Sequence, residues 1–148
     1  MRNLFAALLS ILVLGTAISA HVMASPPQSK AGITQTYELR AHNESKLSTT
    51  SLELQIPADI TVLKVDQAPA GTVDTPKTGD RITAINWKVN IEPGKYLALK
   101  FEAKNPSGAA EIHWSVKQQM ADGSTVDWSD APGSKEKAPV TTISVATH

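Results

Sequence analysis

The feature that most restricts the fold of this chain is an alternation of apolar and polar residues with a period of two. It is clearest in YLALKFEAK at residues 96–104, where Leu97, Leu99 and Phe101 fall on one side. Successive side chains of a β-strand point to opposite faces of a sheet, so this alternation predicts strands with one buried face. No stretch after residue 20 keeps the helical period of 3.6 residues.

The same pattern recurs along the chain, and turn-forming residues separate the repeats. Strands are predicted at residues 34–42, 51–57, 60–66, 80–90, 96–104, 110–120 and 140–146. Turns are predicted at residues 69–71, 78–80, 92–95, 105–108 and 121–123. The polar segment 131–139 is expected to form a mobile loop. Short strands at regular spacing predict an all-β protein, an antiparallel β-sandwich.

Residues 1–20 have the layout of a secretory signal peptide. Arg2 supplies the positive charge, an apolar run from Leu4 to Leu14 follows, and small residues close the segment. The run is shorter than the roughly 20 residues of a transmembrane helix. We therefore expect a leader over 1–20 and a single domain over 21–148 that is periplasmic or secreted.

Three cut sites fit the end of this leader. Cleavage after Ala20 makes His21 the first residue, whereas cleavage after Ser19 leaves Ala20 ahead of it. Cleavage after Ala24 removes the histidine altogether. The local pattern of small residues leaves these alternatives open.

Composition excludes several classes of site. The chain has no cysteine, which excludes thiolate metal sites, iron–sulfur clusters, thiol nucleophiles and blue-copper centres. It has 14 basic and 14 acidic residues, and loss of Arg2 with the leader leaves a net charge of about −1. A near-neutral domain without a basic block lacks the electrostatic footprint of a nucleic-acid-binding protein.

A histidine at the first position of a mature chain is a metal chelator. The α-amine and the Nδ1 atom of His21 can close a six-membered ring on one metal ion. Cu(II) prefers such nitrogen and oxygen donors and leads the divalent ions in affinity. The alternative is a terminal histidine with no metal role.

AHNE at residues 41–44 supplies further candidate donors. His42 and Glu44 are two residues apart, so their side chains share a face if the strand continues that far. A carboxylate and an imidazole beside His21 would complete a set of nitrogen and oxygen ligands. Taken singly, each of the two residues is better explained as a solvated surface side chain.

The three tryptophans divide by context. Trp87 and Trp114 fall on apolar faces and are predicted to lie in the core. Trp128 follows a turn in a polar segment, where an indole ring stacks over a ligand or cation, or else covers the open end of the sandwich. His113 faces away from Trp114 and is predicted to be exposed, and His148 lies at the chain end.

No catalytic motif is present. The sequence contains no GxGxxG, P-loop, GxSxG or HExxH pattern, and no two carboxylates stand out as a glycosidase pair. We therefore predict no catalytic residues.

An ordered set of motifs resembles the YcnI-like family of secreted copper-binding domains. The matching segments are HVMASPPQSKAG (21–32), YELRAHNES (37–45), LELQIPADITV (52–62), INW (85–87), IEPGKYLALKFEAK (91–104) and IHWSVKQQMADGSTVDW (112–128). The resemblance implies an immunoglobulin-like β-sandwich that binds one Cu(II) through a single-histidine brace. It implies His21 and Glu44 as ligands and Trp128 close to the metal, and it favours cleavage after Ala20.

Two positions depart from the family pattern. The Val-Pro pair that usually precedes Asn-Glu is Ala41-His42 here, so His42 is either a further ligand or lies outside the site. The usual Pro-Gly-Trp is Pro69-Ala70-Gly71, which lacks the tryptophan.

These observations predict an exported, monomeric Cu(II)-binding protein that acts in copper trafficking or homeostasis as a metallochaperone. Its partners would be proteins that donate or accept copper. Cu(I) is disfavoured because the domain offers no Cys and only Met23 and Met120 as soft donors. The alternatives are a histidine-brace copper oxygenase, with His42 as second histidine, and a metal-free adhesion or chaperone-like sandwich.

Overall fold

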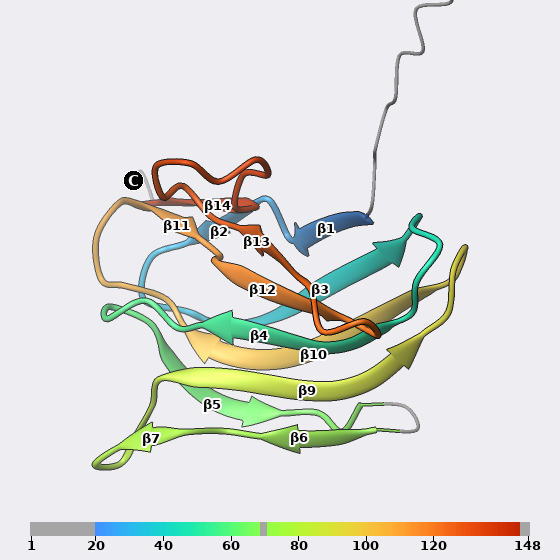
Figure 1. The fold of residues 1–148 in the computed structure, drawn as a ribbon. Helices are drawn as coiled ribbons and strands as arrows, with labels where there is room; N and C mark the ends of the chain where they lie inside the picture. Colours follow the sequence, from blue (N-terminus) through green and yellow to red (C-terminus); the bar gives the residue numbers. More distant parts are fainter. Residues whose placement is uncertain (1–19, 69–70, 146–148) are drawn as a thin grey trace, which may run out of the picture.

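The computed structural model describes residues 20–68 and 71–145. Fourteen β-strands lie within these ranges, which contain no helix (Figure 1). The alternating sequence thus folds as an all-β protein, as predicted. No helix within the described ranges could span a membrane, and residues 1–19, where the leader is expected, lie outside them.

The first large sheet has four antiparallel strands. Their spatial order is β1 (Ala20–Ser25), β3 (Thr34–Asn43), β10 (Tyr96–Lys104) and β5 (Thr61–Val65). Residues that are not neighbours in sequence therefore meet across β1, β3 and β10.

The second large sheet has five antiparallel strands. Their order is β13 (Thr125–Trp128), β12 (Val116–Met120), β4 (Thr49–Gln55), β9 (Ala84–Ile91) and β6 (Thr72–Asp74). Figure 1 shows β4 and β9 side by side in this sheet, with β3 and β10 in the other layer.

Two small sheets complete the described strands. One joins β11 (Ala110–His113), β14 (Val140–Ser144) and β2 (Gln28–Lys30), and β2 runs parallel to β14. The other is a hairpin of β7 (Lys77–Thr78) and β8 (Arg81–Ile82).

One hydrophobic core fills the space between the large sheets. It contains Leu39, Leu99 and Phe101 from the first sheet and Leu52, Leu54 and Trp87 from the second. The rings of Tyr37, Phe101 and Trp114 lie within 5.0–5.6 Å of one another, a spacing at which aromatic pairs add to the burial energy. Trp87 and Trp114 are buried, which confirms their prediction as core residues.

The predicted strand 110–120 is in fact two strands, β11 and β12, which belong to different sheets. The backbone N–H of Trp114 donates to Pro139, and the carbonyl of the next residue, Ser115, accepts from Gln55. The chain changes partners between these two residues. Ile112, Trp114 and Val116 all stay buried through the change, so the alternation of the sequence does not reveal it.

Several strands lie outside the predicted ranges. They are β1, β2, β6, β7 and β13, and most are short. Their pairing with neighbouring strands supplies the stability that their own sequences do not indicate. The segment 131–139 is a loop, as predicted, and Glu136 forms one isolated bridge with Trp128.

Candidate metal centre

His21 and His42 lie opposite each other on the outer face of the first sheet. The antiparallel register pairs their Cα positions across β1 and β3. The next pair, Val22 and Ala41, is buried in the core. Because successive side chains alternate between faces, burial of this apolar pair turns both imidazoles toward solvent.

Glu44 joins the two histidines. Its Oε2 atom lies 3.3 Å from His21 Nε2, and its Oε1 atom lies 3.4 Å from His42 Nδ1. The side chains are accessible, with exposed fractions of 53% for His21, 43% for His42 and 34% for Glu44. The structure thus brings together the three residues that the sequence predicts as metal ligands.

Asn43 fixes the turn that carries Glu44, a role that the sequence does not indicate. It is 1% exposed, and its Nδ2 atom donates to the backbone carbonyls of Leu47 and Ile91, each at 2.7 Å. Its Oδ1 atom accepts from the backbone N–H of Ser45 at 3.0 Å and from the Ser45 hydroxyl at 2.8 Å. A buried amide with both ends satisfied holds the chain direction at Glu44.

A shallow hollow of about 240 Å³ lies beside the two histidines, lined by His21, Met23, Arg40, His42 and Tyr96. Tyr96 is the Cα partner of His42 on β10, and their rings meet edge to face at 6.5 Å. The Arg40 guanidinium lies 5.1 Å from the centre of the Tyr96 ring, a cation–π distance. The sequence does not predict that Met23, Arg40 and Tyr96 line this hollow, although alternation along their strands places them on the outer face.

The donor types of this site fit Cu(II), which favours imidazole nitrogen and carboxylate oxygen. Within the described residues, Glu44 forms ion pairs with histidines and with no Lys or Arg, so no fixed cation competes for its carboxylate. Also within those residues, no three His, Asp or Glu side chains already surround a common metal position. A metal ion would therefore have to displace the contacts between Glu44 and the two imidazoles, and a chelate through His21 Nδ1 also requires the His21 ring to turn, because Nε2 faces Glu44 here.

Trp128 lies in the hydrophobic core rather than in a polar environment. It is 5% exposed, and its indole N–H donates to Gln118 Oε1 at 3.2 Å. Its Cα partner Val116 is also buried in the core cluster. Among the described residues, the Trp128 side chain makes no hydrogen bond to His21, His42 or Glu44. Its predicted place near a metal stays a prediction.

His113 forms a second histidine–carboxylate group, on β11 of the small three-stranded sheet. It is exposed, as predicted, with a fraction of 43%. Its Nε2 atom lies 3.3 Å from Glu111 Oε2, and its Nδ1 atom pairs with Asp130. The two carboxylates contact the two nitrogens of the same His113 ring, so this group provides only one imidazole as a possible metal ligand. His148 lies outside the described residues, as do Pro69 and Ala70.

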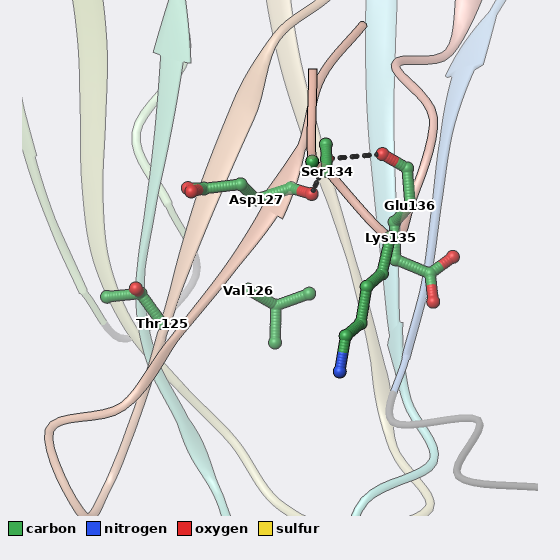
Figure 2. Close-up of a pocket in the computed structure, with 7 residues that line it drawn as sticks. Thr125, Val126, Asp127, Ser134, Lys135 and Glu136 are labelled. Carbon is green, nitrogen blue, oxygen red and sulfur yellow. Dashed lines mark hydrogen bonds between the residues drawn. The ribbon is translucent and has the colours of Figure 1, made fainter. Parts of the chain in front are cut away.

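A larger hollow of about 460 Å³ lies between β13 and the segment 133–136. Figure 2 shows the Ser134 hydroxyl bonded to the carbonyls of Asp127 and Glu136, each at 2.8 Å, which holds the loop against the strand. The carboxylates of Asp127 and Glu136 point away from each other in this view. The lining of this hollow contains no histidine, and its carboxylates do not point to a common position (Figure 2). It therefore does not resemble the group of His21, His42 and Glu44.

Comparisons with known proteins show the family of this chain and a copper-binding relative. A family model described as a domain of unknown function, DUF1775, matches residues 21–145. The copper-binding protein CutI of Bacillus subtilis (strain 168) is 31% identical over 140 residues, which cover 93% of this chain and 69% of CutI.

Two solved structures share the fold. A protein from Nocardia farcinica with an immunoglobulin-like fold superposes with a TM-score of 0.67 and 23% identity, over 86% of this chain and 99% of that one. A non-cellulosomal cohesin from Archaeoglobus fulgidus gives a TM-score of 0.56 and 14% identity, over 87% and 92%. The described residues therefore form an immunoglobulin-like β-sandwich, as predicted.

Proposed function

Since the chain belongs to the DUF1775 family, the YcnI-like family that its motifs resemble, we propose that it is an exported copper-binding protein. The protein binds Cu(II) on the outer face of β1 and β3. It acts in copper trafficking or homeostasis as a metallochaperone. Copper is its cargo, and the protein performs no turnover. The copper-binding relative CutI supports the choice of metal.

The observation that carries this proposal is the position of the Glu44 carboxylate between His21 and His42. An imidazole and a carboxylate from His21 and Glu44 supply one nitrogen and one oxygen donor to Cu(II). His42 contacts the other carboxylate oxygen, so it either orients Glu44 or becomes a third side-chain ligand. A hydrogen-bond partner on the free oxygen of a carboxylate ligand, as His42 is for Glu44, holds that ligand in the orientation that binds the metal.

The proposed brace needs one more donor, the α-amine of His21. In the uncut chain this nitrogen belongs to the peptide bond with Ala20 and cannot act as an amine. Cleavage after Ala20 would free the α-amine of His21 at the start of β1. In the order of the sheet, Tyr96 on β10 lies two strands away from this amine. The proposal therefore includes a signal peptide over 1–20 and a periplasmic or secreted mature protein that begins at His21.

The test is mass spectrometry of the exported protein, combined with a Cu(II) titration followed by tryptophan emission. We expect a mature start at His21 and quenching that saturates at one copper per chain. Quenching is lost in His21→Ala, and in a chain with one extra alanine before His21. His113→Ala is the matched control, because His113 is an exposed histidine paired with carboxylates elsewhere.

A mature start at Ser25, or quenching that does not depend on His21, would overturn the proposal. No change in emission, together with no copper retained after dialysis, would favour the metal-free sandwich instead.

A copper oxygenase acting on polysaccharide is the second candidate, because the structure places a second histidine, His42, beside Glu44. Such an enzyme also needs a flat aromatic surface for sugar, and aromatic residues make up only 5% of this chain. We expect the copper-loaded protein to release no oligosaccharides from a polysaccharide in the presence of hydrogen peroxide. Release that disappears in His42→Ala would favour the enzyme.

A further inference from the structure

Met23 is an exposed thioether at the edge of the proposed copper site. It is 63% exposed, although methionine is usually buried. The other methionine of the described residues, Met120, is 4% exposed, and its sulfur lies 3.8 Å from the Thr49 hydroxyl in the interior. Burial accounts for Met120 but not for Met23.

The strand geometry places Met23 with the histidines. Met23 follows His21 by two residues on β1, so both side chains lie on the outer face. Met23, His21 and His42 line the same hollow of about 240 Å³. A flexible thioether and two imidazoles can therefore reach a common point in this space.

These donors differ from those around Glu44 in the metal ion that they suit. Thioether sulfur selects Cu(I), and imidazole binds copper as well, whereas carboxylate oxygen suits harder ions. The Arg40 guanidinium also lines the hollow. Its positive charge is partly balanced by Glu38, whose Oε1 atom lies 3.2 Å from the guanidinium. What remains of that charge repels a divalent ion more strongly than a monovalent one, since the Coulomb energy is proportional to the charge.

We propose that the hollow binds Cu(I) through the Met23 sulfur and the imidazoles of His21 and His42. The two oxidation states then use overlapping but different donors, with Glu44 needed for Cu(II) and Met23 for Cu(I). This inference rests on the proposed copper-binding function and extends it to Cu(I), which the sequence alone disfavours because it does not show that Met23 lies beside two histidines.

The test measures the affinity of the mature chain for each ion separately. Cu(I) is titrated without oxygen in competition with the chromophoric chelator bicinchoninate, and Cu(II) in competition with nitrilotriacetate. The variants are Met23→Leu, which preserves volume and shape, Met120→Leu as the matched control, and Glu44→Gln. X-ray absorption of the Cu(I)-loaded protein reports copper–sulfur bonding directly.

We expect Met23→Leu to weaken Cu(I) by at least about tenfold, the lower end of the loss when a partner of a metal ligand is removed. It leaves Cu(II) affinity unchanged and abolishes the copper–sulfur signal. Glu44→Gln gives the converse, weaker Cu(II) and unchanged Cu(I). Met120→Leu changes neither affinity.

The outcomes separate the two proposals. If the wild-type chain binds neither ion, the proposed function fails and this inference fails with it. If Cu(II) binds but Cu(I) does not, or if Cu(I) binds equally to wild type and Met23→Leu, only this inference is overturned. It is also overturned if Met23→Leu weakens both ions equally, because the donors are then not divided by oxidation state.

Discussion

The side-chain amide of Asn43 donates a hydrogen bond to the backbone carbonyl of Ile91, 2.7 Å away. Asn43 ends β3 in the first large sheet, and Ile91 ends β9 in the second. The same amide also holds the carbonyl of Leu47. The turn that carries Glu44 is therefore tied to both layers of the sandwich, so the site depends on a residue whose side-chain hydrogen bonds go to Leu47, Ile91 and Ser45 and not to the donor side chains.

Replacing Asn43 should damage stability and copper binding together. Asn43→Ala leaves the buried carbonyl of Ile91 without its donor, which costs about 1–3 kcal/mol of unfolding free energy. It also frees the turn at Glu44, so copper affinity falls. Urea unfolding and copper titration measure the two effects. Glu44→Gln is the control, with weaker copper binding at wild-type stability, and wild-type copper affinity in Asn43→Ala would contradict the positioning role.

Two buried tryptophans should respond differently to the same substitution. The Trp114 indole N–H donates to Thr141 Oγ1 at 3.0 Å, whereas the Trp87 indole N–H has no partner among the described residues. Trp114→Phe is therefore expected to destabilise by about 1 kcal/mol more than Trp87→Phe, the net value of one hydrogen bond. Urea unfolding measures both variants.

A double-mutant cycle of Trp114→Phe with Thr141→Val isolates that hydrogen bond from the volume change. A coupling energy near zero would show that the Trp114–Thr141 contact adds nothing to stability.

Gly71 should not tolerate a side chain. A Cβ atom at this position would lie 2.2 Å from the backbone carbonyl oxygen of Lys88, a distance that no real contact allows. Gly71→Ala must therefore push β6 away from β9, which pairs Thr72 with Lys88. We expect a loss of about 1–3 kcal/mol, as for other overpacked sites, measured by thermal unfolding. Gly108→Ala is the control, because a Cβ atom there meets no atom within 4 Å.

Stability should fall at alkaline pH because of Tyr37. Burial raises the pKa of the Tyr37 hydroxyl, and its hydrogen bonds with Ser29 and Asn105 offset part of that effect. The folded-state pKa is thus above the unfolded value of about 10, so this contribution is complete below pH 10 and is lost as pH rises through the folded-state pKa. Urea midpoints between about pH 8 and pH 11 should fall less steeply in Tyr37→Phe.

Tyr96→Phe is the control for this pH dependence, because the Tyr96 ring is exposed. An equal alkaline slope in Tyr37→Phe and wild type would assign the loss to other groups.

The fold could be predicted largely from local alternation. The expected strand at 96–104 matches β10, and Leu99 and Phe101 lie in the core as their side of the strand predicts. The split of 110–120 could not be predicted, because Trp114 and Ser115 hydrogen-bond to residues distant in sequence. Period-two alternation records which face is buried and not which sheet the strand joins.

The candidate site was predictable in part. The spacing of His42 and Glu44 indicated a shared face, and the structure brings both together with His21. Met23 and Tyr96 could not be placed there, since their neighbourhood depends on the register of β1, β3 and β10. The polar neighbours of Trp128 suggested an accessible ring, whereas its partner Val116 shows that the strand turns the ring inward.

The pairing of Val22 with Ala41 has a consequence for how this surface can change over evolution. These two side chains keep their strands in phase from inside the molecule, and they never face solvent. The outward positions on either side of them can exchange one functional group for another without disturbing that phase. A single inserted or deleted residue in β1, however, would exchange the two faces and bury a polar side chain such as the His21 imidazole where the Val22 side chain now packs. The side chains on this outer face can therefore be substituted, whereas the number of residues in β1 cannot change.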